Sequence, residues 1–170
     1  FTVAHEAAHG NIAGGVRSAR KIEAICGWWT GVPLLVPYRA FQIVHLTHHA
    51  HVNDPEKDPD HWVAGKNPLS ILFGCATITF YYGYLLVFGS LSQNKAVRRN
   101  WRVNLTAIGL GLAVLGGLIW VGYAWHALWL WILPAYIAQI LLAFSFDWLP
   151  HYPHMLRERF RDTRIIIALG

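Results

Sequence analysis

The sequence predicts an all-α, polytopic membrane domain, and three observations lead to this prediction. Of its 170 residues, 55% are hydrophobic and only 14% are charged, whereas a soluble domain has about 25% charged residues. A run of 44 residues, from 103 to 146, contains no Asp, Glu, Lys or Arg. The basic residues fall into short clusters beside such runs, as in the loops that flank membrane spans. This pattern argues against a disordered chain and against a nucleic-acid-binding protein.

The uncharged run has the length of two spanning helices, because about 20 helical residues cross the hydrocarbon core of a bilayer. Tryptophans mark its middle and its ends: Trp120, Trp125, Trp129 and Trp131 in the middle, with Trp101 and Trp148 at the ends. Aromatic belts of this kind lie at the two surfaces of a membrane. We therefore expect a helical hairpin that turns near residues 123–127.

Basic clusters flank both ends of this hairpin and are missing from its connection. They are Lys95, Arg98, Arg99 and Arg102 on one side and Arg157, Arg159, Arg161 and Arg164 on the other. The positive-inside rule then places both ends in the cytoplasm.

Two further apolar stretches are too short or too interrupted for pairs of spans. The stretch 67–94 is uncharged over 28 residues and lies between segments that we place on one side of the membrane. An even number of crossings is then needed, so we expect an interfacial or re-entrant helix at 68–91. Residues 24–38 contain Pro33 and Pro37, which favours a half-span or a helix on the membrane surface.

Eight of the ten histidines lie in three short stretches, the first of which is His5-Glu6-Ala7-Ala8-His9. On a helix, His5 and His9 project from one face and can reach the same metal ion. The same spacing is the HExxH pattern of zinc peptidases, in which Glu6 would be the general base. Taken alone, the stretch is equally compatible with a polar helix face that binds nothing.

The second stretch places His45, His48 and His49 at positions i, i+3 and i+4 of one helical face. Three such imidazoles repel each other when protonated and are costly to bury, so metal ligation explains them better than packing does. Sites rich in imidazole and without thiolate suit iron, zinc or copper. His51 and His61 follow, each as a ligand, a second-shell donor or part of the surface.

The third stretch, residues 146–154, contains Asp147, His151 and His154 at the end of the predicted hairpin. Pro150 and Pro153 make a continuous helix unfavourable there. Asp147 is the first charge after the uncharged run. It either meets solvent at the membrane boundary or binds a metal or a histidine ligand.

Together these motifs resemble the membrane fatty acid desaturase superfamily, which also includes hydroxylases and carotenoid ketolases. The motifs are His-x-x-x-His at 5–9, His-x-x-His-His at 45–49 and Trp-Leu-Pro-His-x-Pro-His at 148–154. The resemblance covers residues 1–170 as a single membrane domain. It implies a non-haem di-iron centre on the cytoplasmic face, which uses dioxygen and electrons from a small redox protein such as a ferredoxin or a cytochrome b5-like protein.

The resemblance also implies which side chains hold the two iron ions. The implied ligands are His5, His9, His45, His48, His49 and His151. Further ligands or second-shell groups would come from Glu6, His51, His61, Asp147 and His154. Other carboxylates that would offset the charge of the irons are Asp54, Asp58 and Asp60.

Two departures from the family pattern matter. The family has another His-x-x-His-His, whereas this sequence reaches Gly170 without one and starts at Phe1 without a methionine. We therefore expect an interior fragment, truncated at both ends. The first motif has three intervening residues where many acyl-lipid or acyl-CoA desaturases have four. The substrate (an acyl-CoA, an acyl lipid or a carotenoid) and the choice between desaturation and hydroxylation stay open.

Oxidation of an unactivated C–H bond needs a redox-active metal, which zinc is not. The implied protein is an oxidoreductase of lipid metabolism in a bacterial inner membrane or the endoplasmic reticulum. An intramembrane zinc peptidase built on residues 5–9 is the main alternative, but it leaves the histidines of residues 45–49 unexplained. A metal transporter would place ligating groups within the spans, and residues 103–146 offer only His126.

Basic residues on the predicted cytoplasmic side suggest where electrons arrive. They are Arg17, Arg20, Lys21, Arg98, Arg99, Arg102, Arg157, Arg159, Arg161 and Arg164. They predict that the electron donor is acidic. The alternative is that these residues only set the topology and contact anionic lipid.

Overall fold

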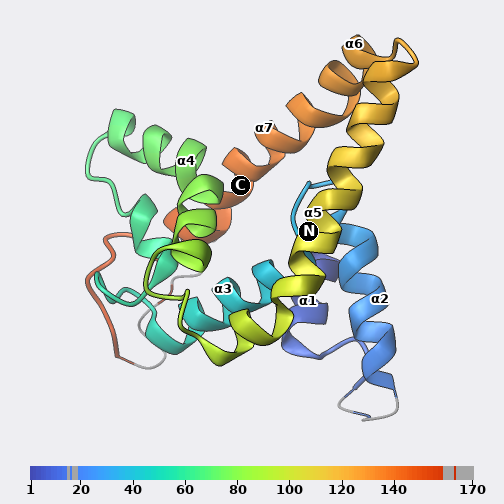
Figure 1. Cartoon of the computed structure of the whole chain (residues 1–170). Helices are drawn as coiled ribbons and strands as arrows, with labels where there is room; N and C mark the ends of the chain where they lie inside the picture. The colour runs from blue at the N-terminus through green and yellow to red at the C-terminus, as the bar shows by residue number, and fades with distance from the viewer. Residues whose placement is uncertain (15, 17–18, 159–162, 164–170) are drawn as a thin grey trace, which may run out of the picture.

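The computed structural model describes residues 1–14, 16, 19–158 and 163, and within them it contains helices and turns but no strand. The all-α prediction is confirmed (Figure 1). The helices are α1 (Thr2–His9), α2 (Arg20–Gly31), α3 (Tyr38–His51), η2 (Pro59–Val63), α4 (Pro68–Val87), α5 (Lys95–Trp120), α6 (Ala124–Ala127), η3 (Leu128–Ile132), α7 (Leu133–Leu142) and η4 (Ala143–Trp148).

The predicted hairpin is present. The helix α5 and the continuous helical run from α6 to η4 have 26 and 25 residues. In Figure 1 they meet at the α6 end and diverge away from it. They turn at Val121 to Tyr123, where Gly122 has a φ of 86°, so the turn begins slightly earlier than expected. Of the most apolar 18-residue segment of α5, only 6% is buried inside the protein. This surface needs an apolar solvent such as a bilayer.

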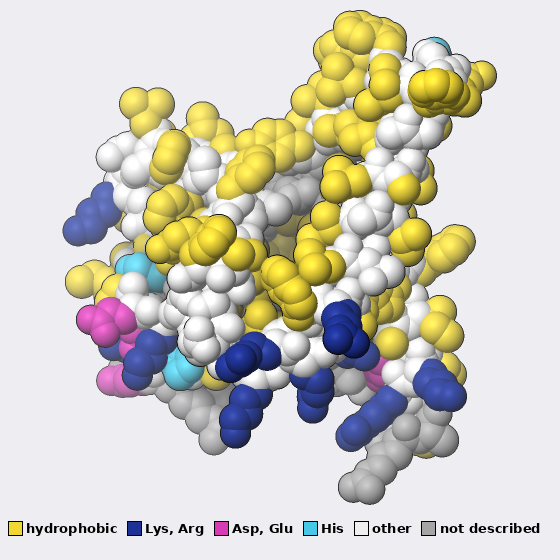
Figure 2. All heavy atoms as spheres, in the orientation of Figure 1, with side chains coloured by type: hydrophobic (Ala, Val, Ile, Leu, Met, Phe, Trp, Pro, Cys, Tyr) yellow, Lys and Arg dark blue, Asp and Glu magenta, His cyan; other side chains and the backbone are white. Residues whose placement is uncertain are grey.

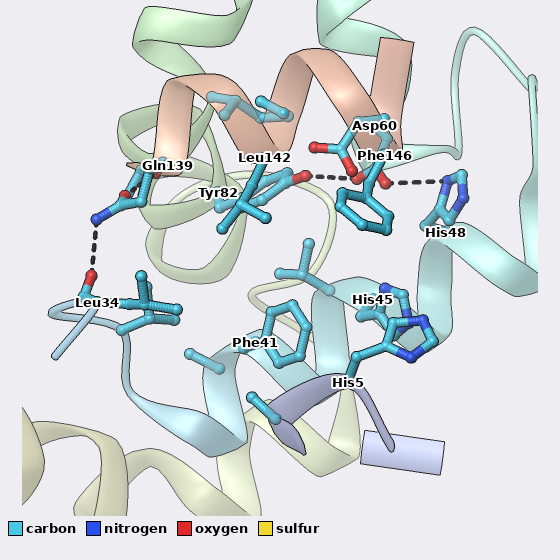
Figure 3. Close-up of a pocket in the computed structure, with 18 of the residues that line it drawn as sticks. His5, Leu34, Phe41, His45, His48, Asp60, Tyr82, Gln139, Leu142 and Phe146 are labelled. Carbon is cyan, nitrogen blue, oxygen red and sulfur yellow. Dashed lines mark hydrogen bonds and ion pairs between the residues drawn. The ribbon is translucent and has the colours of Figure 1, made fainter. Parts of the chain in front are cut away.

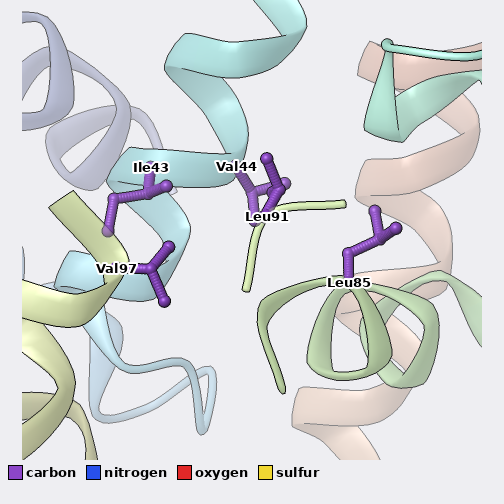
Figure 4. Packing of buried hydrophobic residues seen from close by; sticks show 5 residues of the cluster. All are labelled: Ile43, Val44, Leu85, Leu91 and Val97. Carbon is purple, nitrogen blue, oxygen red and sulfur yellow. The ribbon is translucent and has the colours of Figure 1, made fainter. Parts of the chain in front are cut away.

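The stretch 68–91 begins with one unbroken helix, α4, which starts at a capping box formed by Asn67 and Ser70. Its 20 residues are a third segment with the length and composition of a membrane span. Its amino-terminal end lies near the end of the hairpin, where the indole N–H of Trp148 donates to the carbonyl of Gly65. At its other end, Leu85 belongs to a cluster of buried residues with Ile43, Val44, Leu91 and Val97 (Figure 4).

Both ends of α4 therefore lie near the open end of the hairpin, where α5 begins and η4 ends. Leu85, near the carboxyl end of α4, packs with residues of α3 and of the start of α5. A helix that crosses the membrane would separate its two ends by the thickness of the bilayer. The middle of α4, however, bonds to α7 inside the candidate span 124–148, where the Tyr136 hydroxyl donates to the carbonyl of Ala76. The interfacial or re-entrant helix therefore stays a prediction beside the third candidate span.

The helix α2 ends at Gly31 after 12 residues, and a turn through Pro33 and Leu35 leads to α3. Leu35 has a φ of 58°, in the left-handed region. The stretch 24–38 is thus no full span, as its prolines predicted. Trp29 on α2 is 81% exposed, and an exposed indole of this kind suits a membrane surface.

The first helix packs closely on the third because its inner face carries only small side chains. Ala4, Ala7 and Ala8 are buried in α1. The Tyr38 hydroxyl donates to the carbonyl of Ala7 at 2.8 Å, and the Gln42 amide donates to the carbonyl of Ala8 at 3.0 Å. These two bonds fix α1 against α3, and with it both histidines of the first motif.

Charge is unevenly distributed over the surface. In Figure 2, most Lys and Arg side chains lie along the lower edge, whereas hydrophobic side chains cover the hairpin above them. The exposed basic residues include Lys21, Lys95, Arg98, Arg99, Arg102 and Arg157. Of the other residues in the predicted clusters, Arg17, Arg159, Arg161 and Arg164 lie outside the described residues.

Candidate metal centre

Two helices bring four imidazoles together. His5 and His9 come from α1, and His45 and His49 come from α3, one helical turn apart in each case. The Nε2 atom of His45 lies 3.0 Å from that of His9 and 3.2 Å from that of His49. One nitrogen from each of the four residues lies within 4.8 Å of the others.

This geometry fits a shared metal ion. A metal–imidazole bond of about 2.0–2.1 Å places two nitrogens on the same ion about 2.9–3.4 Å apart, for octahedral to tetrahedral angles. Both measured Nε2 separations around His45 lie in this range.

Burial favours the neutral form of three of these imidazoles. It lowers the pKa of His45 to about 3 and that of His49 to about 4, and the neighbouring histidines lower both further. Burial, followed by His5, also lowers the pKa of His9. The neutral ring is the form that binds a metal, so His9, His45 and His49 are held toward the ligating form.

His48 lies on the same face of α3 but in different surroundings. Its Nδ1 atom is 2.9 Å from Asp58 Oδ1 and 3.2 Å from Asp60 Oδ2, and all three side chains are buried. Asp58 is itself held by the backbone N–H groups of Asn53, at 2.7 Å, and Asp60, at 2.9 Å.

A carboxylate that accepts from one ring nitrogen orients the other nitrogen toward a metal. A metal would therefore bind His48 through Nε2. The ring of His151 lies 4.9 Å from that of His48, centroid to centroid, and is also buried. These two histidines form a second group beside the first.

Asp60 connects this group to α4. The hydroxyl of Tyr82 donates to Asp60 Oδ1 at 2.5 Å (Figure 3). Burial raises the pKa of Asp60 to about 6, against the opposing effect of His48. The sequence analysis missed Tyr82, because it is one of three successive aromatic residues and only the packing of α4 distinguishes it.

Two further histidines have ring nitrogens without a partner among the residues that the structure describes. They are the Nε2 atom of His154 and the Nδ1 atom of His61, both buried. The ring of His154 lies 6.3 Å from that of His61 and 6.4 Å from that of His151. Burial lowers the pKa of His154 to about 4. Such unsatisfied buried nitrogens fit a site that holds a further ligand. His51, by contrast, is exposed at the end of α3.

The predicted carboxylates have different positions. Glu6 accepts from the Asn11 amide at 2.8 Å and contacts His5 Nδ1 at 2.9 Å. These bonds, the one from Asn11 first, lower its pKa, opposite to what a general base requires. Asp54 contacts Arg157 at 3.3 Å and caps its own turn through the N–H groups of Glu56 and Lys57. Its described contacts are thus with this turn and not with the histidines.

A cavity of about 530 Å³ adjoins both groups of histidines. His5, His45 and His48 lie toward one end of it, and Leu34 and Gln139 lie toward the other (Figure 3). Between them the wall is apolar or aromatic, with Phe41, Leu142 and Phe146. Asp147 also lines the cavity. A cavity of this size and lining suits part of an alkyl chain.

Comparison with known proteins agrees with this arrangement. The model of the fatty acid desaturase family matches residues 1–166. The chain is similar to the sn-1 acyl-lipid omega-3 desaturase (ferredoxin) of Nostoc sp. (strain 36), with 24% identity over 158 residues. The match covers 84% of this chain and 42% of that relative, so the chain spans less than half of the relative's length. No solved structure matches. Since the family match extends over nearly the whole chain, the protein belongs to the fatty acid desaturase family.

Proposed function

We propose that the chain is part of a membrane-bound, non-haem di-iron enzyme that desaturates a long-chain acyl group with dioxygen. The observation that carries this proposal is the meeting of four imidazoles from α1 and α3 at one end of an apolar cavity. Hydroxylation of the same acyl group is the alternative reaction at such a site. The relative's printed name supports an acyl lipid as the substrate class.

In this proposal the histidines divide between two iron positions. His5, His9, His45 and His49 serve one position, and His48 and His151 serve the other. Bound iron would supply the redox chemistry that activates dioxygen. Asp58 and Asp60 orient His48, and the aromatic wall of the cavity holds the chain and excludes water.

The zinc peptidase is the weaker candidate. Its general base would be Glu6, whose two carboxylate oxygens are already bound to His5 and Asn11. A single zinc site also needs only three protein ligands, whereas four imidazoles meet here.

Metal analysis and lipid profiling test the function together. The full-length protein would be expressed in a host that lacks the corresponding fatty acid, and its metal content would be measured after purification. We expect two irons per protein and new unsaturated acyl chains in the host lipids. One zinc per protein with unchanged lipids would refute the proposal and favour the peptidase.

The electron balance requires a partner. Desaturation removes two electrons and two protons from the acyl substrate. Reduction of dioxygen to two waters consumes four electrons and four protons. The other two electrons must come from a donor, and the described part of the chain contains no Cys pair that would ligate an iron–sulfur cluster. We propose an acidic donor, a ferredoxin or a cytochrome b5-like protein, that docks on the exposed basic residues near the start of α5.

Charge reversal tests this docking. Changing Arg98, Arg99 and Arg102 to Glu should lower donor-supported turnover by tenfold or more, roughly, at low salt, because electrostatic steering accelerates association. Turnover driven by peroxide should stay near normal. An equal loss in both assays would show that the three residues only support folding or insertion, which labelling of the inserted protein would check.

We also propose that the histidines face the cytoplasm of a bacterial inner membrane or of the endoplasmic reticulum. Cysteines introduced at Arg99 and at His126 should then react with impermeant reagents from opposite sides, Arg99 from the cytoplasm. Labelling of Arg99 from outside would make α4 a true span and reverse this topology.

A further inference from the structure

At the end of the cavity opposite the histidines the lining includes a polar side chain, Gln139, whereas Leu142 and Phe146 on the same wall are apolar. Gln139 comes from α7, inside the candidate span 124–148. Along the same helical run, Leu142 and Phe146 follow at i+3 and i+7, so the three residues share one face that lines the cavity. Figure 3 shows Gln139 at the end opposite His48, with Leu142 between.

The Gln139 amide is held from two sides. Its Oε1 atom accepts from the Thr79 hydroxyl of α4 at 2.6 Å, and its Nε2 atom donates to the carbonyl of Leu34 at 2.7 Å. The side chain therefore joins α7, α4 and the turn after α2. A long unbranched side chain would otherwise move among rotamers, whereas two hydrogen bonds keep this one in place.

These two hydrogen bonds make it costly for an alkyl chain to displace the Gln139 side chain. An apolar group that pushed Gln139 aside would leave the amide, the hydroxyl and the carbonyl without partners in an apolar environment. Because Gln139 lies deep in the candidate span and the histidines lie at its end, the part of a substrate that reaches Gln139 is the methyl end and not the polar head.

The distance along the wall limits the length of this segment. The seven helical steps from Gln139 to Phe146 correspond to about 10 Å at about 1.5 Å per step. A saturated chain advances about 1.25 Å per carbon, from bonds of about 1.52 Å at about 111°. The wall then accommodates about eight carbons.

We propose that Gln139, held by Thr79 and the Leu34 carbonyl, is a specificity-determining residue. It stops the methyl end of the acyl chain and limits the carbons beyond the oxidised position to about eight. This inference rests on the proposed function, because it takes the cavity to be the acyl site. It goes further by naming the residue that sets the maximum length of the acyl chain.

Product analysis with acyl lipids of graded chain length tests the proposal in the full-length enzyme. Gln139→Ala should extend the longest accepted methyl-side segment by two carbons or more, and Gln139→Phe should shorten it. The ratio of turnover between neighbouring chain lengths should shift by about tenfold. Thr79→Val keeps the side-chain volume and removes one hydrogen bond to Gln139. It should make the chain-length limit less sharp and change its position little.

Leu141→Ala is the matched control, since Leu141 neighbours Gln139 on α7 but is 60% exposed and does not line the cavity. It should leave the chain-length profile unchanged. If Gln139→Ala and Gln139→Phe keep the wild-type profile while they oxidise lipid, Gln139 is not the stop and the proposal is wrong.

A binding measurement separates this proposal from the proposed function. An acyl lipid with a photoreactive group at its methyl end should label peptides containing Gln139 or Thr79, with or without turnover. Labelling there without any lipid oxidation would support the site and refute the reaction. Labelling confined to other peptides would overturn the site, whatever the reaction.

Discussion

The two groups of histidines use the same residue type in unlike surroundings. His45 and His49 meet His5 and His9, and the only carboxylate in described contact with these four is the Glu6 side chain. His48, from the same face of α3, is buried against Asp58 and Asp60. One helix thus supplies one group that is purely imidazole and another in which carboxylates orient the ring. The comparison teaches that the two groups of histidines are unequal in charge, as the two proposed metal positions would then be.

The two groups also depend on different contacts. The first exists because α1 packs on α3 through Tyr38 and Gln42. The second depends on the turn after α3, which carries Asp58, and on His151 at the end of the hairpin. A substitution in one group should therefore affect that group most strongly, and the following variants test this separation.

The largest effect is expected for His45→Ala. His45 contacts the rings of His5, His9 and His49 at 4.5–4.9 Å, centroid to centroid, so its loss disrupts the whole first group. Iron content should fall and lipid oxidation should drop by roughly a hundredfold or more, beyond what second-shell changes cause. Membrane insertion should persist, since α3 is outside the candidate spans.

Iron per chain and product yield would be measured beside His51→Ala, which changes an exposed histidine of the same helix. Normal oxidation by His45→Ala would remove His45 from the ligand set and with it the proposed first position.

A smaller loss is expected for Asp58→Asn, which removes the charge next to His48 and keeps the shape. Loss of an orienting carboxylate lowers metal affinity or activity by about 10- to 100-fold. Metal titration of the purified protein would measure it, and the loss should concern one of the two proposed iron positions. Asp54→Asn is the control, because Asp54 contacts Arg157 and its own turn. Equal effects of the two variants would contradict the assignment of Asp58.

For Glu6→Gln we expect a decrease in turnover of about tenfold, at the low end for an orienting group. Glu6 is bound to His5 Nδ1, and a neutral amide would hold the ring less firmly. A peptidase would instead lose all activity with its general base. Steady-state assays of lipid oxidation and of peptide cleavage distinguish these outcomes.

The smallest effect belongs to Tyr82→Phe, which removes the hydroxyl that donates to Asp60. The buried carboxylate oxygen would lose a partner, which costs about 1–3 kcal/mol in the free energy of unfolding. Thermal unfolding in detergent would show a lower midpoint, while iron still binds His48. An unchanged midpoint would mean that another group replaces the hydroxyl.

Much of the fold followed from the sequence because its signals are local. The 3.6-residue period alone puts His5 beside His9 and His45 beside His49 once helices form. The uncharged run from 103 to 146 likewise predicts a hairpin, because its length matches two spans. For α4, composition and length allow a span, and whether it crosses the membrane or is interfacial or re-entrant stays a prediction.

Tertiary structure decided what no local spacing contains. The first and second motifs meet only because the buried alanines of α1 let Tyr38 and Gln42 reach its backbone, across 31 and 34 residues. Of the acidic residues after α3, Asp58 and Asp60 turn inward to His48 and Asp54 turns outward to Arg157. Tyr82 and Gln139 carry no pattern of their own, and they line one cavity because packing brings α4 and α7 together there. Side-chain packing between distant segments sets such contacts, and a sequence period describes only one element at a time.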